Sequence, residues 1–71
     1  MMRQLRPHSA FLREPTKEAA RRCEFLGFKL YDRVGCQWMV ESPEGLHVYL
    51  HKIDDINALM NLVEELRREE R

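Results

Sequence analysis

Few residues of this chain combine a reactive side chain with a spacing that would let it act. The metal-ligating candidates are two cysteines and two histidines, at Cys23, Cys36, His47 and His51. Zinc sites use closely spaced Cys and His ligands, whereas these four fall on an expected helix, turn and strand without that spacing. His47 and His51 point the same way along one expected strand but stand about 13 Å apart. We expect no metal site and no cofactor.

Catalytic pairs are equally scarce. A thiolate nucleophile needs a base within hydrogen-bond reach, but Cys36 falls in an expected tight turn with no histidine as its expected neighbour. The paired carboxylates Asp54-Asp55 and Glu64-Glu65 are adjacent on expected helices, where neighbouring residues do not face each other. The three glycines are isolated, and each marks an expected turn rather than a phosphate-binding loop. The pattern favours a protein that is not an enzyme and has no small-molecule substrate.

One constellation remains, on a three-stranded sheet expected between Phe28 and Lys52. The segment Pro43-Glu44-Gly45 suits a three-residue hairpin loop that ends in a left-handed residue and sets Ser42 opposite Leu46. Side chains alternate along strands, so one face is apolar and forms the core: Phe28, Leu30, Trp38, Val40, Leu46, Val48 and Leu50. The other face is the candidate binding face: Lys29, Tyr31, Arg33, Gln37, Met39, His47, Tyr49 and His51.

The arrangement of this face follows from the same register. A first loop of three residues, Val34-Gly35-Cys36, would keep Arg33 on the binding face. The expected cross-strand neighbours are Gln37 with His51, Met39 with Tyr49, and Glu41 with His47.

Three interpretations of the face stay open. Its tyrosines, imidazoles and cations could stack unpaired bases and hold phosphates. Aromatic residues are also simply what strands prefer. In the third interpretation Tyr31, Met39 and Tyr49 meet their mates in a second copy across a two-fold axis.

Two expected helices position the sheet. Thr16 is a good N-cap and Gly27 a good residue to follow a helix, which predicts a helix from about Lys17 to Leu26. Asp54 or Asp55 caps the second helix, whose apolar stripe is Ile56, Leu59, Met60, Val63 and Leu66. The sequence therefore predicts an α+β fold in the order α-β-β-β-α, a three-stranded antiparallel sheet with both helices on one face.

Residues 1–15 are expected to be an arm, mobile or docked, on a single domain of residues 16–71. Pro7 and Pro15 exclude one long helix there. Phe11 and Phe25 form a candidate secondary patch: we expect Phe25 to pack against Phe11 and Leu12 of the arm, and the alternative is a partner surface.

Composition limits the class of partner. The formal net charge is zero, which gives little long-range steering towards nucleic acid. Residues 1–22 nevertheless carry six Lys and Arg against two Glu, enough for a few phosphate contacts or for docking on an acidic helix. No stretch approaches the roughly 20 apolar residues of a membrane span, and two cysteines do not make a disulfide framework. We expect a cytoplasmic protein with no membrane partner.

The middle of the chain resembles the HicA toxins, small ribonucleases with a double-stranded-RNA-binding-like fold. The residues that carry the resemblance are Gly27-Phe28, Gly35 and Pro43-Glu44-Gly45, within about half of the chain. The family places its catalytic histidine two residues after the glycine of the first hairpin, and Gln37 stands there. Glutamine is neither a general acid nor a general base, so the resemblance implies the fold without the activity.

These observations predict a small non-enzymatic binding module that acts through its exposed sheet face, as a homodimer or on a protein partner. An RNA- or DNA-binding module is the alternative. A HicA-like ribonuclease that depends on His47 or His51 is the third hypothesis.

Overall fold

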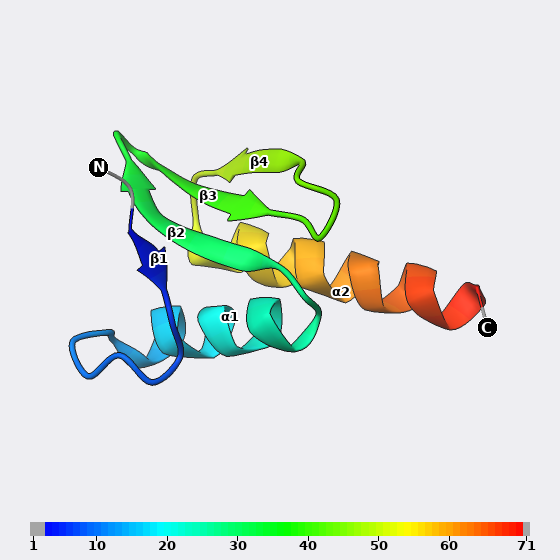
Figure 1. Ribbon diagram of the computed structural model, residues 1–71, viewed down its shortest axis with the longest axis horizontal. Helices are drawn as coiled ribbons and strands as arrows, with labels where there is room; N and C mark the ends of the chain where they lie inside the picture. Colours follow the sequence, from blue (N-terminus) through cyan, green and yellow to red (C-terminus); the bar gives the residue numbers. More distant parts are fainter. Residues whose placement is uncertain (1–2, 71) are drawn as a thin grey trace.

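The computed structural model describes residues 3–70. Within that range the chain forms two helices and one four-stranded antiparallel sheet in the spatial order β1-β2-β3-β4. The elements are β1 (Gln4–Leu5), α1 (Glu14–Phe25), β2 (Lys29–Val34), β3 (Gln37–Glu41), β4 (His47–Leu50) and α2 (Ile53–Glu69). Both helices lie on one face of the sheet (Figure 1). The expected α+β class is confirmed. Met1, Met2 and Arg71, which the expected arm and domain include, lie outside the described residues.

The expected strand count of three is wrong, because the arm contributes β1. Gln4 pairs with Tyr31 and Leu5 with Leu30, and the Asp32 amide donates to the Arg3 carbonyl at 2.9 Å. Leu5 is buried in the core. Burial of one leucine and a few main-chain hydrogen bonds therefore fix a strand that is only two residues long.

Helix α1 ends where the sequence predicts, at a glycine. The Phe28 amide donates to the Cys23 carbonyl at 2.7 Å and the Gly27 amide to the Glu24 carbonyl at 3.1 Å, which is the Schellman arrangement. It needs a left-handed residue, and Gly27 has φ +85°. The glycine thereby ends the helix and directs the chain into β2.

Both helices begin earlier than expected. Helix α1 starts at Glu14 with Pro15 in its first turn, so Thr16 is not its cap. Proline suits that position because the first amides of a helix have no intrahelical acceptor. Helix α2 starts at Ile53, and Asp54 and Asp55 lie in its first turn, where their charge complements the helix dipole.

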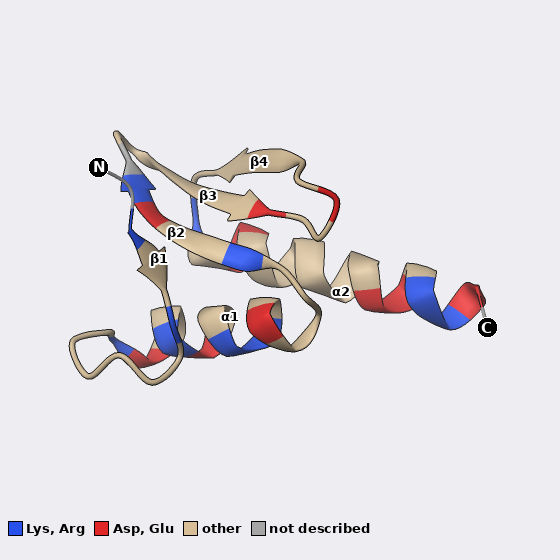
Figure 2. Cartoon of the chain, in the orientation of Figure 1, with Lys and Arg blue, Asp and Glu red and all other residues tan. Residues whose placement is uncertain are grey.

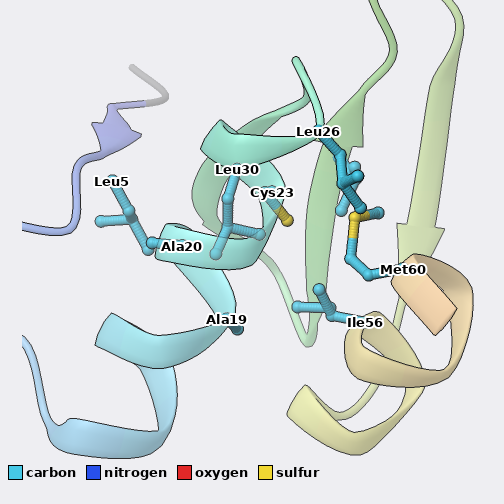
Figure 3. Close-up of a cluster of buried hydrophobic side chains, with 9 residues drawn as sticks. Leu5, Ala19, Ala20, Cys23, Leu26, Leu30, Ile56 and Met60 are labelled. Atoms are coloured by element: carbon cyan, nitrogen blue, oxygen red, sulfur yellow. The ribbon is translucent and has the colours of Figure 1, made fainter. Parts of the chain in front are cut away.

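The core lies between the helices and the sheet. Figure 3 shows side chains from β1, α1, β2 and α2 meeting there. Its buried members are Leu5, Ala19, Ala20, Cys23, Leu26, Leu30, Val40, Ile56 and Met60. Phe28, Trp38 and Leu50 pack against it half-buried, as expected of the apolar sheet face.

Two residues of the expected core are not buried. Leu46 is 67% exposed and Val48 is 36% exposed, although both stand on the apolar side of the sheet. Position in the strand alternation was predicted correctly, but burial also requires a helix beneath the strand. The two helices do not cover that side of β4.

Candidate binding surface

The face of the sheet opposite the helices holds the residues proposed from the sequence, with the exception of Arg33. Three of its cross-strand pairs are as expected: Met39 opposite Tyr49, Glu41 opposite His47, and Gln37 beside His51, whose side-chain nitrogens lie 3.2 Å apart. The hairpin that sets this register is also as predicted. The Ser42 amide donates to the Leu46 carbonyl at 2.8 Å, and Gly45 has φ +90°.

Met39 is buried, not exposed as the sequence predicted. Only 2% of it is accessible, although it lies on the face without helices. It occupies the middle of β3, with Tyr31 and Tyr49 as its neighbours on the two flanking strands. Aromatic side chains in such positions reach across to one another, so the two tyrosines are placed to cover the methionine. A partner would contact the tyrosines rather than Met39.

Glu41 connects two strands through its carboxylate. The Tyr31 hydroxyl donates to Glu41 Oε1 at 3.1 Å, and His47 Nε2 lies 3.4 Å from Oε2. Desolvation, together with the hydrogen bond to Glu41 and its negative charge, raises the pKa of Tyr31 above the usual value for a phenol. Tyr31 and His47 are thereby held in place on the two flanking strands.

Arg33 does not lie where the expected loop would put it. Val34, not Arg33, pairs with Gln37, and a one-residue register shift falls between Tyr31 and Val34. The shift leaves Asp32 and Arg33 together opposite one residue of β3, as at a β-bulge. The Arg33 guanidinium lies 5.9 Å from the Trp38 ring centroid and donates to the Cys36 carbonyl at 3.2 Å. Trp38 packs on the core side, so Arg33 is removed from the binding face.

The remaining candidates stay accessible on that face. Lys29, His47, Tyr49 and His51 are exposed, and Tyr31 and Gln37 are half-buried. Tyr49 is the most accessible aromatic of the sheet, at 48%. Gln4, opposite Tyr31 on β1, extends the face by one strand. Sequence reasoning missed Gln4 because two residues of strand leave no periodic pattern.

Phe11 and Phe25 do not form one patch. Phe11 lies in the loop before α1 with the Arg3 guanidinium 4.7 Å from its ring centroid. Phe25 is the last residue of that helix and is 87% exposed. Phe11 precedes the first residue of this 12-residue helix and Phe25 is its last, and an ideal helix of that length is about 17 Å long. The expected packing of Phe25 against the arm is therefore wrong.

Phe25 instead borders a hollow between the helix ends. This hollow of about 370 Å³ is lined by Phe25, Leu26, Glu64, Arg67 and Arg68. Both helices carry many charges there, whereas β4 carries none (Figure 2).

The reactive side chains are kept apart. Cys23 is buried in the core, and desolvation raises the pKa of its thiol from 9.0 to about 11. Cys36 is exposed in the turn between β2 and β3. Among residues 3–70, no three His, Cys, Asp or Glu side chains are grouped to hold a metal ion. In the same part of the chain, neither helix is long and apolar enough to cross a membrane.

Gln37 lies on β3 beside His51. Its amide nitrogen is 3.2 Å from the imidazole nitrogen His51 Nε2, a contact that holds both side chains on the outer face of the sheet. Comparison of this chain with protein-family models, curated proteins and solved structures finds no match.

Proposed function

We propose that this chain is a small non-enzymatic binding module that joins a protein surface through its sheet, with a second copy of itself as the first partner. The observation that carries the proposal is the exposure of apolar side chains around β4. Val48 and Tyr49 of β4 and Leu46 just before it are all accessible, with Leu46 and Val48 on the helix side of the sheet and Tyr49 on the other side. Monomeric domains seldom leave contiguous apolar patches open, and such patches mark interaction sites.

Size supports the same proposal. A domain of 71 residues buries only about 60% of the surface that its unfolded chain exposes, so its stability is marginal. Association that covers further apolar surface adds to that stability. A face with tyrosines and few exposed charges at its centre has the composition of an interface core.

Sedimentation velocity over a concentration series tests the proposal. We expect the wild-type chain to pass from monomer to dimer, and Tyr49→Glu to shift this transition at least tenfold to higher concentration. Phe25→Glu is the matched control, because Phe25 is more exposed than Tyr49 but lies at the far end of α1. A monomer at all concentrations, or a dimer weakened only by Phe25→Glu, contradicts the proposal.

RNA binding is the second candidate, and a basic hollow favours it. About 400 Å³ in volume, this hollow is lined by Gln4, Arg6, His8, Glu24, Gly27, Phe28 and Lys29. The order α1-β2-β3-β4-α2, with both helices on one face, is also that of the double-stranded-RNA-binding-like fold which we infer for this part of the chain. Asp54 and Asp55 at the start of α2 oppose a phosphate contact there.

The salt dependence of oligonucleotide affinity distinguishes RNA binding from self-association. If RNA binds, affinity for a single-stranded and a duplex oligonucleotide falls with added salt, and Arg6→Ala and Lys29→Ala each weaken it. Absence of binding at low salt excludes it.

A further inference from the structure

Strand β4 is an open edge of the sheet. Within residues 3–70 it pairs with β3 alone, and the Ser42 amide donates to the Leu46 carbonyl. Because main-chain groups alternate in direction along an antiparallel strand, those of His47 and Tyr49 point away from β3. Unpaired groups of this kind are a template for another strand. The opposite edge, β1, is only two residues long.

Three of the usual protections of an edge strand are missing from β4, although the strand is only four residues long. Natural edges carry charges, proline or a bulge that block further pairing. The strand His47–Leu50 contains no Lys, Arg, Asp or Glu and no proline, and its pairing with β3 runs without a register shift. It appears without charge colour in Figure 2, between charged segments of the chain.

Helix α2 also exposes apolar side chains. Arg22 of α1 reaches one side of α2, where its Nη2 donates to Asn61 Oδ1 at 2.6 Å and Glu64 Oε1 at 3.1 Å. Leu62 and Leu66 lie on roughly the opposite side of that helix, and each is about half exposed. They therefore lie away from the contact between the helices.

We propose that β4 of a second copy of this chain occupies the edge, paired antiparallel about Val48 so that the two sheets become one with all helices on the same face. This pairing rests on the proposed function, self-association, and specifies which strand forms the contact. Val48 then faces Val48 of the second copy, Leu46 faces its Leu50, and His47 faces its Tyr49. The pairing covers the two residues of the apolar face that the helices leave open.

Charge and side-chain chemistry favour this register over the one centred on Tyr49. Just beyond the paired strands it directs the exposed Glu44 of one copy towards the exposed Lys52 of the other, so opposite charges meet at both ends. A register shifted by two residues, centred on Tyr49, would place Leu46 opposite Lys52 and His47 opposite His51. Registers shifted by one residue would require main-chain groups that β3 already uses.

Single-cysteine variants test the register directly. In a Cys36→Ser background, which removes the exposed thiol, Val48→Cys faces its own mate at the Cα separation of about 4.5 Å of a non-hydrogen-bonded pair. That separation allows a disulfide. Leu46→Cys is the matched control, because it is more exposed but lies about 13 Å from its own mate. A mixture of Leu46→Cys with Leu50→Cys should join the two variants to each other.

Mild oxidation of these folded variants, followed by mass spectrometry, gives distinct outcomes. The proposal predicts a covalent dimer of Val48→Cys, a Leu46–Leu50 heterodimer, and at least tenfold less self-linkage of Leu46→Cys. If wild type dimerises in sedimentation but Val48→Cys links no faster than Leu46→Cys, the edge pairing is wrong while self-association stands. A wild-type monomer at every concentration overturns both.

Discussion

Val40 and Val48 stand directly opposite each other on the core side of β3 and β4, yet Val40 is fully buried and Val48 is 36% exposed. At this position the hydrophobic core thus stops between two adjacent strands, although Leu50 at the end of β4 still packs against it. Leu46, the next residue of the same row, is more exposed still. A core that ends inside a sheet leaves apolar surface that a second molecule can cover, and β4 offers free main-chain groups beside it.

The two valines provide a matched pair for stability measurements. Val40→Ala leaves a cavity in the core, and we expect it to lower the free energy of unfolding by about 2 kcal/mol. Val48→Ala should cost less than about 1 kcal/mol in the monomer, because its side chain already contacts solvent. Urea denaturation of both variants at low protein concentration checks this. Equal costs would show that Val48 belongs to the monomer's core.

Arg22 of α1 links the two helices through hydrogen bonds to α2. Its guanidinium reaches Asn61 and Glu64 of α2, and its side chain is only 28% exposed. We expect Arg22→Ala to cost about 1–2 kcal/mol, more than an exposed ion pair contributes. Arg21→Ala is the control, since that neighbouring residue is exposed. If thermal unfolding shifts equally in both variants, the contact adds no specific stability.

The raised pKa of the Cys23 thiol predicts a loss of stability at alkaline pH. Its pKa rises from 9.0 to about 11 on folding, so the folded chain holds the thiol proton more tightly than the unfolded chain. This contribution is fully present below pH 9 and is lost as the pH rises towards 11. Urea midpoints measured between pH 8 and 11 should therefore fall in wild type and fall less steeply in Cys23→Ala. Parallel curves would contradict the prediction.

The raised pKa of Tyr31 also predicts that stability falls as the pH rises, at higher pH than for Cys23. Its folded-state pKa lies above the usual value of 10.0, so its contribution to stability persists below pH 10 and declines as the pH rises through the folded-state pKa. Tyr31→Phe should remove that part of the decline while leaving the Cys23 part in place. An unchanged slope above pH 10 would show that the phenol is not shielded.

Gly27 is constrained twice, by its backbone and by a neighbour. A side chain there would adopt φ +85° and bring its Cβ within 3.3 Å of Pro43 Cγ. Gly45 has a similar φ, but its Cβ would meet no atom within 4 Å. Both alanine variants should lower the free energy of unfolding by roughly 1–2 kcal/mol because of the left-handed conformation, and Gly27→Ala should lower it more. Equal midpoints of thermal unfolding for the two variants would show that the contact with Pro43 adds no further cost.

Turn chemistry made much of the fold predictable. Gly27 after the first helix and Pro43-Glu44-Gly45 in the second hairpin each require a particular backbone conformation, and both were found as expected. Once the hairpin fixed the pairing of Ser42 with Leu46, strand alternation gave the cross-strand neighbours of Met39 and Glu41. Local sequence determines these features, because they depend on one turn and on the period of a strand.

The features that sequence did not predict depend on tertiary contacts. Strand β1 has no periodic signal and is held by the burial of Leu5. The bulge before Val34 shortens the first loop by one residue and turns Arg33 towards Trp38. Met39 is buried because it lies between two tyrosines, whereas Val48 is exposed because no helix lies beneath it. In each case burial is decided by neighbours from other strands or helices.

Hydrogen exchange of the Tyr49 amide tests the central claim most directly, because that group points away from β3 and has no partner strand in the monomer. Exchange is measured residue by residue at protein concentrations from about 1 μM to 1 mM, bracketing a weak association. The account predicts that protection of the His47 and Tyr49 amides rises with concentration while that of Val48, already bonded to β3, changes little. Exchange at Tyr49 that is independent of concentration, in a protein that forms dimers, would contradict edge pairing through β4.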